Sequence, residues 1–180
     1  MVDGQAHWLT VPVRNAGRYM QKISEVEIDS SKDWRKEHMR TLEFSYRKAP
    51  FFDEQFPALR SLLSRDWALL AEFNVAFIRA AFAILGIRTP VLLASEIGAS
   101  GKATGLILDI CRKTGSDTYL HGTHSRDYVD FPLLDGAGVR SLIQDFQCPE
   151  YAQINGPFIP NLSILDMLFN CGAGCLGTIM

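Results

Sequence analysis

The segment at 121–130, HGTHSRDYVD, places several side chains with acid–base chemistry close together. It holds His121, His124, Asp127 and Asp130 in a glycine-containing loop after an expected strand. In open α/β sheets, ligands bind beyond the carboxyl ends of the strands, where such a loop lies. The segment therefore indicates a substrate-binding loop, and a loop that only turns the chain is the alternative. Two His and two Asp residues could also hold a metal, but the spacing typical of metal ligands is missing, so we predict no metal and no cofactor.

A second segment, GASGKAT at 98–104, has the composition of a phosphate-binding loop without its spacing. Glu96 stands where the first glycine of that motif belongs, and Ala103 follows Lys102 where a Ser or Thr would bind the metal. The segment still lies between an expected strand and an expected helix, whose N-terminus offers free N–H groups to an anion. The groups of this weaker anion site would be Gly98, Gly101, Lys102 and Thr104. An ordinary strand-to-helix turn with a solvated lysine is the alternative.

The expected helix that ends at about Tyr46 carries charge on one side and apolar groups on the other. Its outer stripe consists of Lys32, Lys36, Arg40 and Arg47, which we interpret as a solvated face. Arg35 falls instead on the apolar side, where an arginine needs a carboxylate or a ligand phosphate. His38 on the same side is a candidate base, with a buried structural histidine as the alternative. Asp166, inside the apolar stretch 162–170, could pair with Arg35 or line a pocket.

Composition sets limits on the class of protein. The chain has 180 residues, of which 47% are hydrophobic and 21% charged, which is typical of one globular domain over 1–180 and too apolar for disorder. Its 18 Lys and Arg residues against 20 Asp and Glu residues argue against a nucleic-acid partner. Its 4 Cys residues are too few for a disulfide scaffold, so we expect free thiols. The longest apolar stretch, 67–87, contains Glu72, Asn74 and Arg79, and it predicts a buried helix with no membrane span. We therefore expect a cytoplasmic protein.

Periodicity and helix-breaking residues predict an α/β architecture. Strands are expected at 7–13, 22–28, 90–95, 117–122 and 139–146. Helices are expected from a cap within 29–31 to about 46, over 52–64, 66–85 and 101–115, and within 159–172 with Asn161 as the cap. Strands separated by helix-length segments indicate a partly parallel sheet with flanking helices.

Several ordered segments together resemble the WbqC-like protein family almost from end to end. They are WLTVPV, EVEIDSSKDWRKEHMRTLEFSYRKAPFFDEQF, GKATGLILDICRKTGSDTYLHG, DYVDFPLL, QDFQCPEY and FIPNLSILDMLFNCG. The resemblance implies a Rossmann-like fold similar to that of nucleotidylyltransferases. The segment with which family members usually begin has no counterpart here, so we expect the sheet to lack its first strand. The edge exposed in this way would allow self-association.

The resemblance also implies a function. Family members are associated with bacterial surface-polysaccharide gene sets and are described as glycine or aminoacyl transferases. We therefore expect a transferase of O-antigen biosynthesis that adds glycine or another acyl group to a small molecule, a nucleotide-linked 4-amino-4,6-dideoxy sugar. A non-catalytic nucleotide-sugar-binding or scaffold protein of a polysaccharide-assembly complex is the alternative.

The positions that match the family motifs give the expected site. The base that deprotonates the sugar amine would be His38 or the loop residue His124. The substrate-binding residues implied by the resemblance are Arg35, Arg40, Gly101, Lys102, Thr104, Gly122, Tyr128, Asn161 and Asp166. Further family-like positions are Tyr46, Lys48, Asp109, Ser163 and Asn170.

Overall fold

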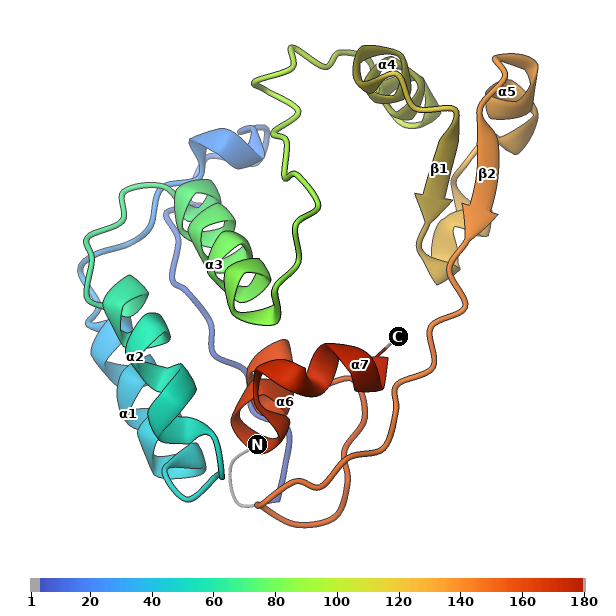
Figure 1. The fold of residues 1–180 in the computed structure, drawn as a ribbon. Coiled ribbons are helices and arrows are strands. Elements are labelled where there is room, and N and C mark those ends of the chain that lie inside the picture. Colours follow the sequence, from blue (N-terminus) through green and yellow to red (C-terminus); the bar gives the residue numbers. More distant parts are fainter. Residues whose placement is uncertain (1–3, 180) are drawn as a thin grey trace. The chain divides into compact units, whose positions relative to one another are not determined.

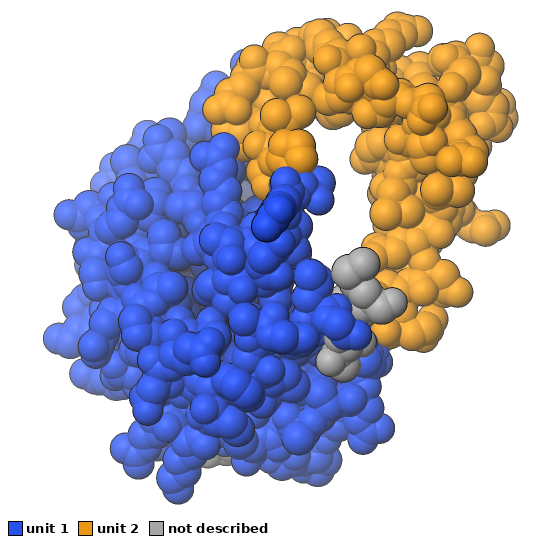
Figure 2. All heavy atoms as spheres, viewed as in Figure 1, with its two compact units in different colours: residues 1–89, 148–180 blue, residues 90–147 orange. Residues whose placement is uncertain are grey.

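The protein divides into two compact units. The computed structural model describes residues 4–179, and Figure 1 shows their helices and strands. Unit 1 comprises residues 1–89 and 148–180, and unit 2 comprises residues 90–147, as coloured in Figure 2. The single domain expected over residues 1–180 stays a prediction.

Unit 1 is built from helices. They are α1 (Trp34–Tyr46), α2 (Phe52–Leu63), α3 (Leu70–Leu85), α6 (Ile164–Cys171) and α7 (Leu176–Ile179), with short 3-10 turns η1 (Ile23–Glu25) and η3 (Ala173–Cys175). Helix α2 packs against α1, α3 and α6 (Figure 1). This central position requires an apolar face along the whole of α2, and its buried residues recur at helical spacing.

Aromatic rings join α6 to the other helices in the core of unit 1. The ring of Phe169 lies 5.0 Å from that of Tyr46 and 5.2 Å from that of Phe52, centroid to centroid. Phe52 in turn stacks on Phe56 at 4.5 Å. Burial of each such side chain stabilises the fold by roughly 1.5–3 kcal/mol. The remaining buried apolar residues of this core are Ile28, Trp34, Leu42, Ala49, Leu59, Leu63, Trp67 and Phe73.

The helix ends follow the expected stop signals better than the expected start signals. Helix α3 ends at Gly86, whose φ of 69° is the left-handed conformation that glycine favours. It begins at Leu70 and not at Asp66, because the backbone just before it bonds to another segment: Ile28 N donates to Ala68 O, and Leu70 N donates to Val26 O.

Two expected caps are also wrong. The residue that precedes α1 is Asp33, outside the predicted 29–31, and Asp29 instead accepts a hydrogen bond from Ser31 N. Helix α6 is capped by Ser163, whose hydroxyl accepts from Leu165 N, because Asn161 lies two residues too early in a turn with a φ of 59°.

The strands expected at 7–13 and 22–28 do not form. Two isolated antiparallel bridges replace them, Val13 with Ile28 and Glu27 with Leu69. Pro12 has no N–H to donate to a ladder, and the 3-10 turn η1 bends the chain where the second strand would begin. The segment is therefore extended, but only single backbone bonds hold it to the helices.

Unit 2 contains the sheet. Its elements are α4 (Thr104–Thr114), β1 (Thr118–His121), the 3-10 turn η2 (Thr123–Asp127), α5 (Phe131–Gly136) and β2 (Arg140–Ile143). Strands β1 and β2 pair in parallel, with Thr118 opposite Arg140. The pair confirms a mixed α/β structure with a small parallel sheet. A separate apolar core, Leu108, Cys111, Val129, Leu134 and Val139, stabilises the unit.

The strand expected at 90–95 is wrong. Its backbone enters a series of turns, in which Glu96 N and Ile97 N both donate to Leu93 O and Ala99 N donates to Ala94 O. These groups are used locally and cannot form a ladder. The expected strands at 117–122 and 139–146 form as the shorter β1 and β2, and helix α4 ends at Gly115 as expected.

Within residues 4–179, none of the helices combines the length and the apolarity needed to cross a bilayer.

Candidate functional site

A cavity of about 520 Å³ lies in unit 1. It is bounded by α1, α2, α3 and the start of α6, together with the extended segment 6–11 and the segment 159–163. Its apolar wall includes Leu9, Val11, Leu42, Leu59, Leu63, Phe73, Phe77 and Leu165. Small-molecule sites have volumes of roughly 300–1,000 Å³ and mostly apolar walls. The cavity therefore has the size and lining of a ligand site.

One helix face supplies several of the polar groups in this cavity. His38, Ser45 and Tyr46 lie on the buried side of α1, and all three line the cavity. They share that side because positions seven and eight residues apart return to the same face of an α-helix. The segment before α6 adds Asn161 and Ser163, and α6 itself adds Asp166.

Asp166 is the most buried polar group of the site. Its side chain lies in the first turn of α6 with 2% of the residue exposed. Its Oδ1 accepts a hydrogen bond from the phenol of Tyr46 (2.6 Å), and its Oδ2 accepts from the phenol of Tyr151 (2.8 Å) and from Nε2 of Gln153 (2.9 Å). Three uncharged donors from two parts of the chain thus hold the carboxylate in place, and the positive end of the α6 dipole adds to its stabilisation.

Both phenols are held in their protonated form. Burial, followed by the hydrogen bond to Asp166 and the charge of that carboxylate, raises the pKa of Tyr46 far above its usual value. Burial and the same carboxylate also raise the pKa of Tyr151. Neither phenol loses its proton at a physiological pH, so both remain donors to Asp166.

His38 has the properties of a general base. It is 8% exposed and meets the ring of Trp34 edge-on at 5.2 Å. Burial lowers the pKa of His38 below 6.5, and a hydrogen bond with the Thr10 backbone and the charge of Glu37 oppose this shift. The imidazole is therefore mainly neutral at pH 7 and can accept a proton from a group in the cavity.

The hydroxyl of Ser45 makes no hydrogen bond to any group of residues 4–179. The residue is 7% exposed, and its backbone oxygen accepts a hydrogen bond from Nδ2 of Asn155 at 2.8 Å. Its Oγ, in contrast, is buried without a hydrogen-bond partner in the described part of the chain. An unsatisfied buried hydroxyl costs about 1–3 kcal/mol. A ligand or a water molecule in the cavity would remove this cost.

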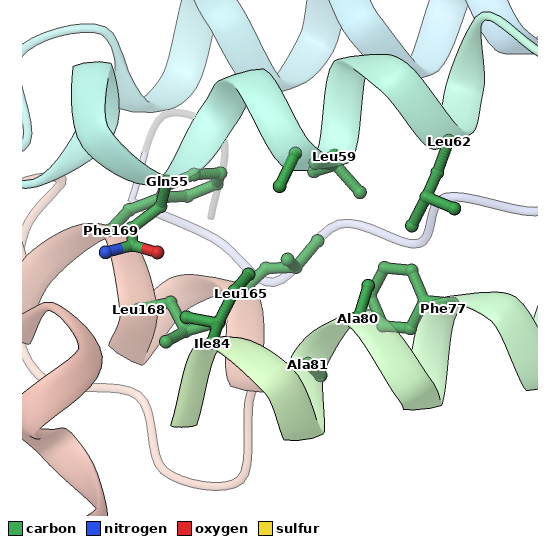
Figure 3. A pocket seen from close by; sticks show the side chains of 11 residues that line it. Gln55, Leu59, Leu62, Phe77, Ala80, Ala81, Ile84, Leu165, Leu168 and Phe169 are labelled. Atoms are coloured by element: carbon green, nitrogen blue, oxygen red, sulfur yellow. The ribbon is translucent and has the colours of Figure 1, made fainter. Parts of the chain in front are cut away.

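A second, much smaller pocket lies between α2, α3 and α6 (Figure 3). Its volume is about 20 Å³ and its wall is almost wholly apolar. A site of this size holds about one water molecule, and water needs several polar partners. Leu59, Phe77 and Leu165 line both this pocket and the large cavity. The small pocket is therefore a packing defect beside the candidate site.

Arg35 is occupied by other groups of unit 1. Its guanidinium forms an ion pair with Asp66 and donates to the backbone oxygen of Arg65 at 2.7 Å. The carboxylate expected beside Arg35 is therefore that of Asp66. The alternative pairing of Arg35 with Asp166 does not form. Arg40 is exposed on the outer side of α1 with the other basic residues of the stripe, as expected for a solvated face.

The other expected site residues lie in unit 2. Gly101, Lys102, Gly122, His124 and Tyr128 are exposed, and Thr104 is buried. Of the expected site residues, His38, Asn161 and Asp166 line the cavity, as do the family-like positions Tyr46 and Ser163, whereas Arg35 and Arg40 of the same unit do not. The roles expected for the residues of unit 2 stay predictions.

The glycine-rich loop of unit 2 is organised by its own side chains. Ser100 N donates to the carboxylate of Asp109 at 2.7 Å, and Lys113 pairs with the same carboxylate at 2.9 Å. The Lys113 contact and the Ser100 hydrogen bonds lower the pKa of Asp109. Thr104 Oγ1 accepts a hydrogen bond from Asp130 N at 3.0 Å, which joins the start of α4 to the cap of α5.

Within residues 4–179, no group of three or more His, Cys, Asp or Glu side chains is placed to hold a metal ion.

Ser45, Tyr151 and Gln153 were not among the expected site residues. Ser45 had a usable signal, because it follows His38 by seven positions on a face that also carries Leu42. Tyr151 and Gln153 lie in an irregular segment without periodicity, so no local pattern marks them.

Comparisons with known proteins agree with the motif resemblance. The model of the WbqC-like protein family matches residues 2–175. An uncharacterized protein of Mycobacterium tuberculosis, Rv1507c, is 35% identical over 168 residues, which cover 92% of this chain and 72% of the relative. No solved structure matches the chain. The extent of the family match, over nearly all of the sequence, shows that the chain belongs to the WbqC-like protein family.

Proposed function

We propose that this protein is a transferase of bacterial surface-polysaccharide biosynthesis. Its acceptor would be the amine of a nucleotide-linked 4-amino-4,6-dideoxy sugar, and the transferred group would be glycine or another acyl group. The observation that carries the proposal is the placement of a neutral, buried His38 in the wall of a cavity of about 520 Å³ together with Asp166. Membership in the WbqC-like family supports the same reaction class. A Rossmann-like arrangement, a cytoplasmic location and self-association through a sheet edge stay predictions.

The reaction requires a base and an activated acyl donor. The donor would be an acyl ester, in which the acyl carbon is bonded to the oxygen of a leaving group. The lone pair of the sugar amine attacks the acyl carbon and forms a C–N bond, while the C–O bond breaks and its electron pair leaves with the oxygen. His38 accepts the proton that the amine loses and returns it to the departing oxygen. General base catalysis of this kind contributes roughly 10²–10⁴-fold to the rate.

Ligand binding and turnover test the proposal in sequence. A thermal-shift screen of the full chain with a nucleotide-linked 4-amino-4,6-dideoxyhexose comes first, because a ligand at 100 times its dissociation constant stabilises a fold by about 2.7 kcal/mol. Incubation of the same sugar with an activated glycyl ester should then give an amide product, detected by mass spectrometry. His38→Gln should lose about 10²-fold or more in rate. Lys36→Gln, on the exposed side of the same helix, is the matched control and should retain the rate.

The outcomes separate the two functional classes. Binding of the nucleotide sugar with no amide product would support the non-catalytic binding protein in place of the transferase. A full rate in His38→Gln would show that His38 is not the base. The absence of both binding and turnover would contradict both functions.

A further inference from the structure

We infer that the cavity of unit 1 contains an ammonium subsite, formed by Asp166 and Ser45 in its polar wall. The subsite accepts the part of a ligand that carries an amine on an apolar body, and it rejects a phosphate or a carboxylate placed at the same point. The inference deepens the proposed function and rests on it in one respect, namely that the acceptor of the transfer binds in this cavity.

The charge of the cavity wall is the first argument. Among the described residues that line the cavity, Asp166 is the carboxylate, and neither a lysine nor an arginine is present. Arg35 of α1 is paired with Asp66 and the Arg65 carbonyl, and Arg40 points to the exposed side of the helix. A phosphate bound in a protein ordinarily meets arginine, lysine or several backbone N–H groups. The described part of the cavity wall contributes no lysine or arginine, so an anion placed at Asp166 would meet that carboxylate without a Lys or Arg to balance it.

The N-terminus of α6 does not change this conclusion. A helix N-terminus can attract an anion through its free N–H groups. Here the hydroxyl of Ser163 accepts from Leu165 N, and Asp166 occupies the first turn with its own negative charge. The local field at this end of the helix is therefore already balanced by a carboxylate, and a second anion would be repelled.

Unused acceptor positions are the second argument. A carboxylate has about four lone-pair positions on its two oxygens. Oδ2 of Asp166 accepts two hydrogen bonds, whereas Oδ1 accepts one within the described residues. Ser45 Oγ, more than nine-tenths buried in the same cavity wall, has no partner in that part of the chain. An ammonium group has three N–H donors and no acceptor, which suits a wall with free acceptor positions.

The apolar wall defines the rest of the ligand. Apolar surface makes up most of the wall around the polar groups, and leucine and phenylalanine side chains are prominent in it. Such a wall favours a body with few hydroxyl groups, because each hydroxyl that enters without a partner loses its hydrogen bonds to water. An amine on a deoxygenated ring fits both requirements.

A series of ligands with one body and different head groups tests the inference without any assumption about the reaction. The probes are cyclohexylamine, cyclohexanol and cyclohexanecarboxylate, titrated into the full chain at pH 7 and followed by calorimetry or ligand-observed NMR. We expect cyclohexylamine to bind at least about tenfold more tightly than cyclohexanol, since a hydrogen bond to a charged group contributes more than a neutral one. We expect the carboxylate not to compete. Equal binding of the three probes, tighter binding of the carboxylate, or no binding of the amine would each overturn the inference.

Two variants assign the effect to the named residues. Ser45→Ala should weaken amine binding severalfold while leaving the melting temperature unchanged or higher, because it removes an unsatisfied buried hydroxyl. Ser61→Ala, exposed on α2, is the matched control and should bind the amine as the unmodified chain does. Asp166→Asn should remove the preference for the amine over cyclohexanol. If Asp166→Asn does not fold, the probe series and Ser45→Ala still decide the question.

Failure of this inference can be distinguished from failure of the proposed function. Amide formation without a preference for the amine probe would overturn the ammonium subsite and leave the transferase in place. A clear preference for the amine probe without amide formation would support the ammonium subsite and contradict the transferase.

Discussion

The phenol of Tyr46 on α1 donates a 2.6 Å hydrogen bond to the carboxylate of Asp166 on α6, across 120 positions of sequence. The bond lies in the wall of the cavity and joins two helices of unit 1 at a buried point. Because both partners are largely buried, the loss of either removes a hydrogen bond of the other at a point with little exposure to solvent. Several measurable properties depend on this arrangement.

Removal of the Tyr46 hydroxyl should destabilise unit 1. Tyr46→Phe keeps the ring packed against Phe169 but leaves Asp166 with two donors in place of three. We expect the free energy of unfolding to fall by about 1–3 kcal/mol, which is the range for a lost bond to a buried charged group. Urea unfolding followed by tryptophan fluorescence measures the change. Tyr19→Phe, at an exposed tyrosine, is the control, and an equal effect in both variants would argue against the buried bond.

Gln153 should hold in place the segment 154–163, part of which lines the cavity. Its amide donates to Asp166 and to Ile159 O, and it accepts from Ile159 N at 2.8 Å. Gln153→Ala should therefore increase the hydrogen-exchange rate of backbone amides at 154–163 and lower stability by about 1–3 kcal/mol. Gln147→Ala, at an exposed glutamine, should leave exchange in that segment unchanged. Unchanged exchange in both variants would show that the segment is held by other contacts.

The protonation of His38 should make stability depend on pH in the acidic range. Burial lowers the pKa of the folded state below 6.5, so the unfolded chain binds more protons in the window between the two values. Stability should therefore rise with pH through this window, which lies below about pH 6.5, and should be lost as the pH falls through it. Thermal unfolding of the native chain and of His38→Asn between pH 4.5 and 7.5 measures this dependence. The variant should show a smaller dependence than the native chain, whereas His7→Asn, at an exposed position, should not.

Two nearby glycines should respond to the same substitution with opposite signs. Gly101 has a φ of 106°, and a Cβ there would lie 3.2 Å from the backbone of Gly105. Gly101→Ala should destabilise unit 2 by about 1–3 kcal/mol because the side chain adds strain. Gly105 lies in α4 with open space around it, so Gly105→Ala should be neutral or stabilising by up to about 1 kcal/mol. Circular dichroism during heating distinguishes the two, and equal effects would contradict the geometry of the loop.

The sequence predicts the helices better than the strands, for a physical reason. Helices α1, α2 and α4 follow local periodicity: α1 ends at Tyr46, shortly before Pro50, and α2 and α4 are followed directly by Ser64 and Gly115. Neighbouring residues therefore contain most of the needed information. A strand forms only if a partner supplies the other half of its hydrogen bonds. The segments at 7–13, 22–28 and 90–95 have strand-like composition, but turns and single bridges take up their backbone groups.

The candidate site shows the same division between local and distant information. Asp166 was recognisable because an acid in an apolar helix must be satisfied, and the structure satisfies it. Its partners were not recognisable, because Tyr46 lies on a distant helix and Tyr151 in a segment without periodicity. Similarly, the position of Arg35 required a carboxylate, but only the fold identifies this carboxylate as Asp66.

The order of the two units along the chain has a consequence for biosynthesis. Unit 1 is discontinuous, because residues 90–147 of unit 2 are inserted between α3 and α6 (Figure 2). During translation α1, α2 and α3 leave the ribosome first, yet Phe169 and Asp166, which complete their core and their cavity, are synthesised after all of unit 2. The apolar face of these helices therefore remains uncovered by α6 while unit 2 is synthesised. Folding of unit 1 therefore cannot be completed before unit 2 has been synthesised, and a ribosome stalled near residue 150 would present the helices with an incomplete core to chaperones.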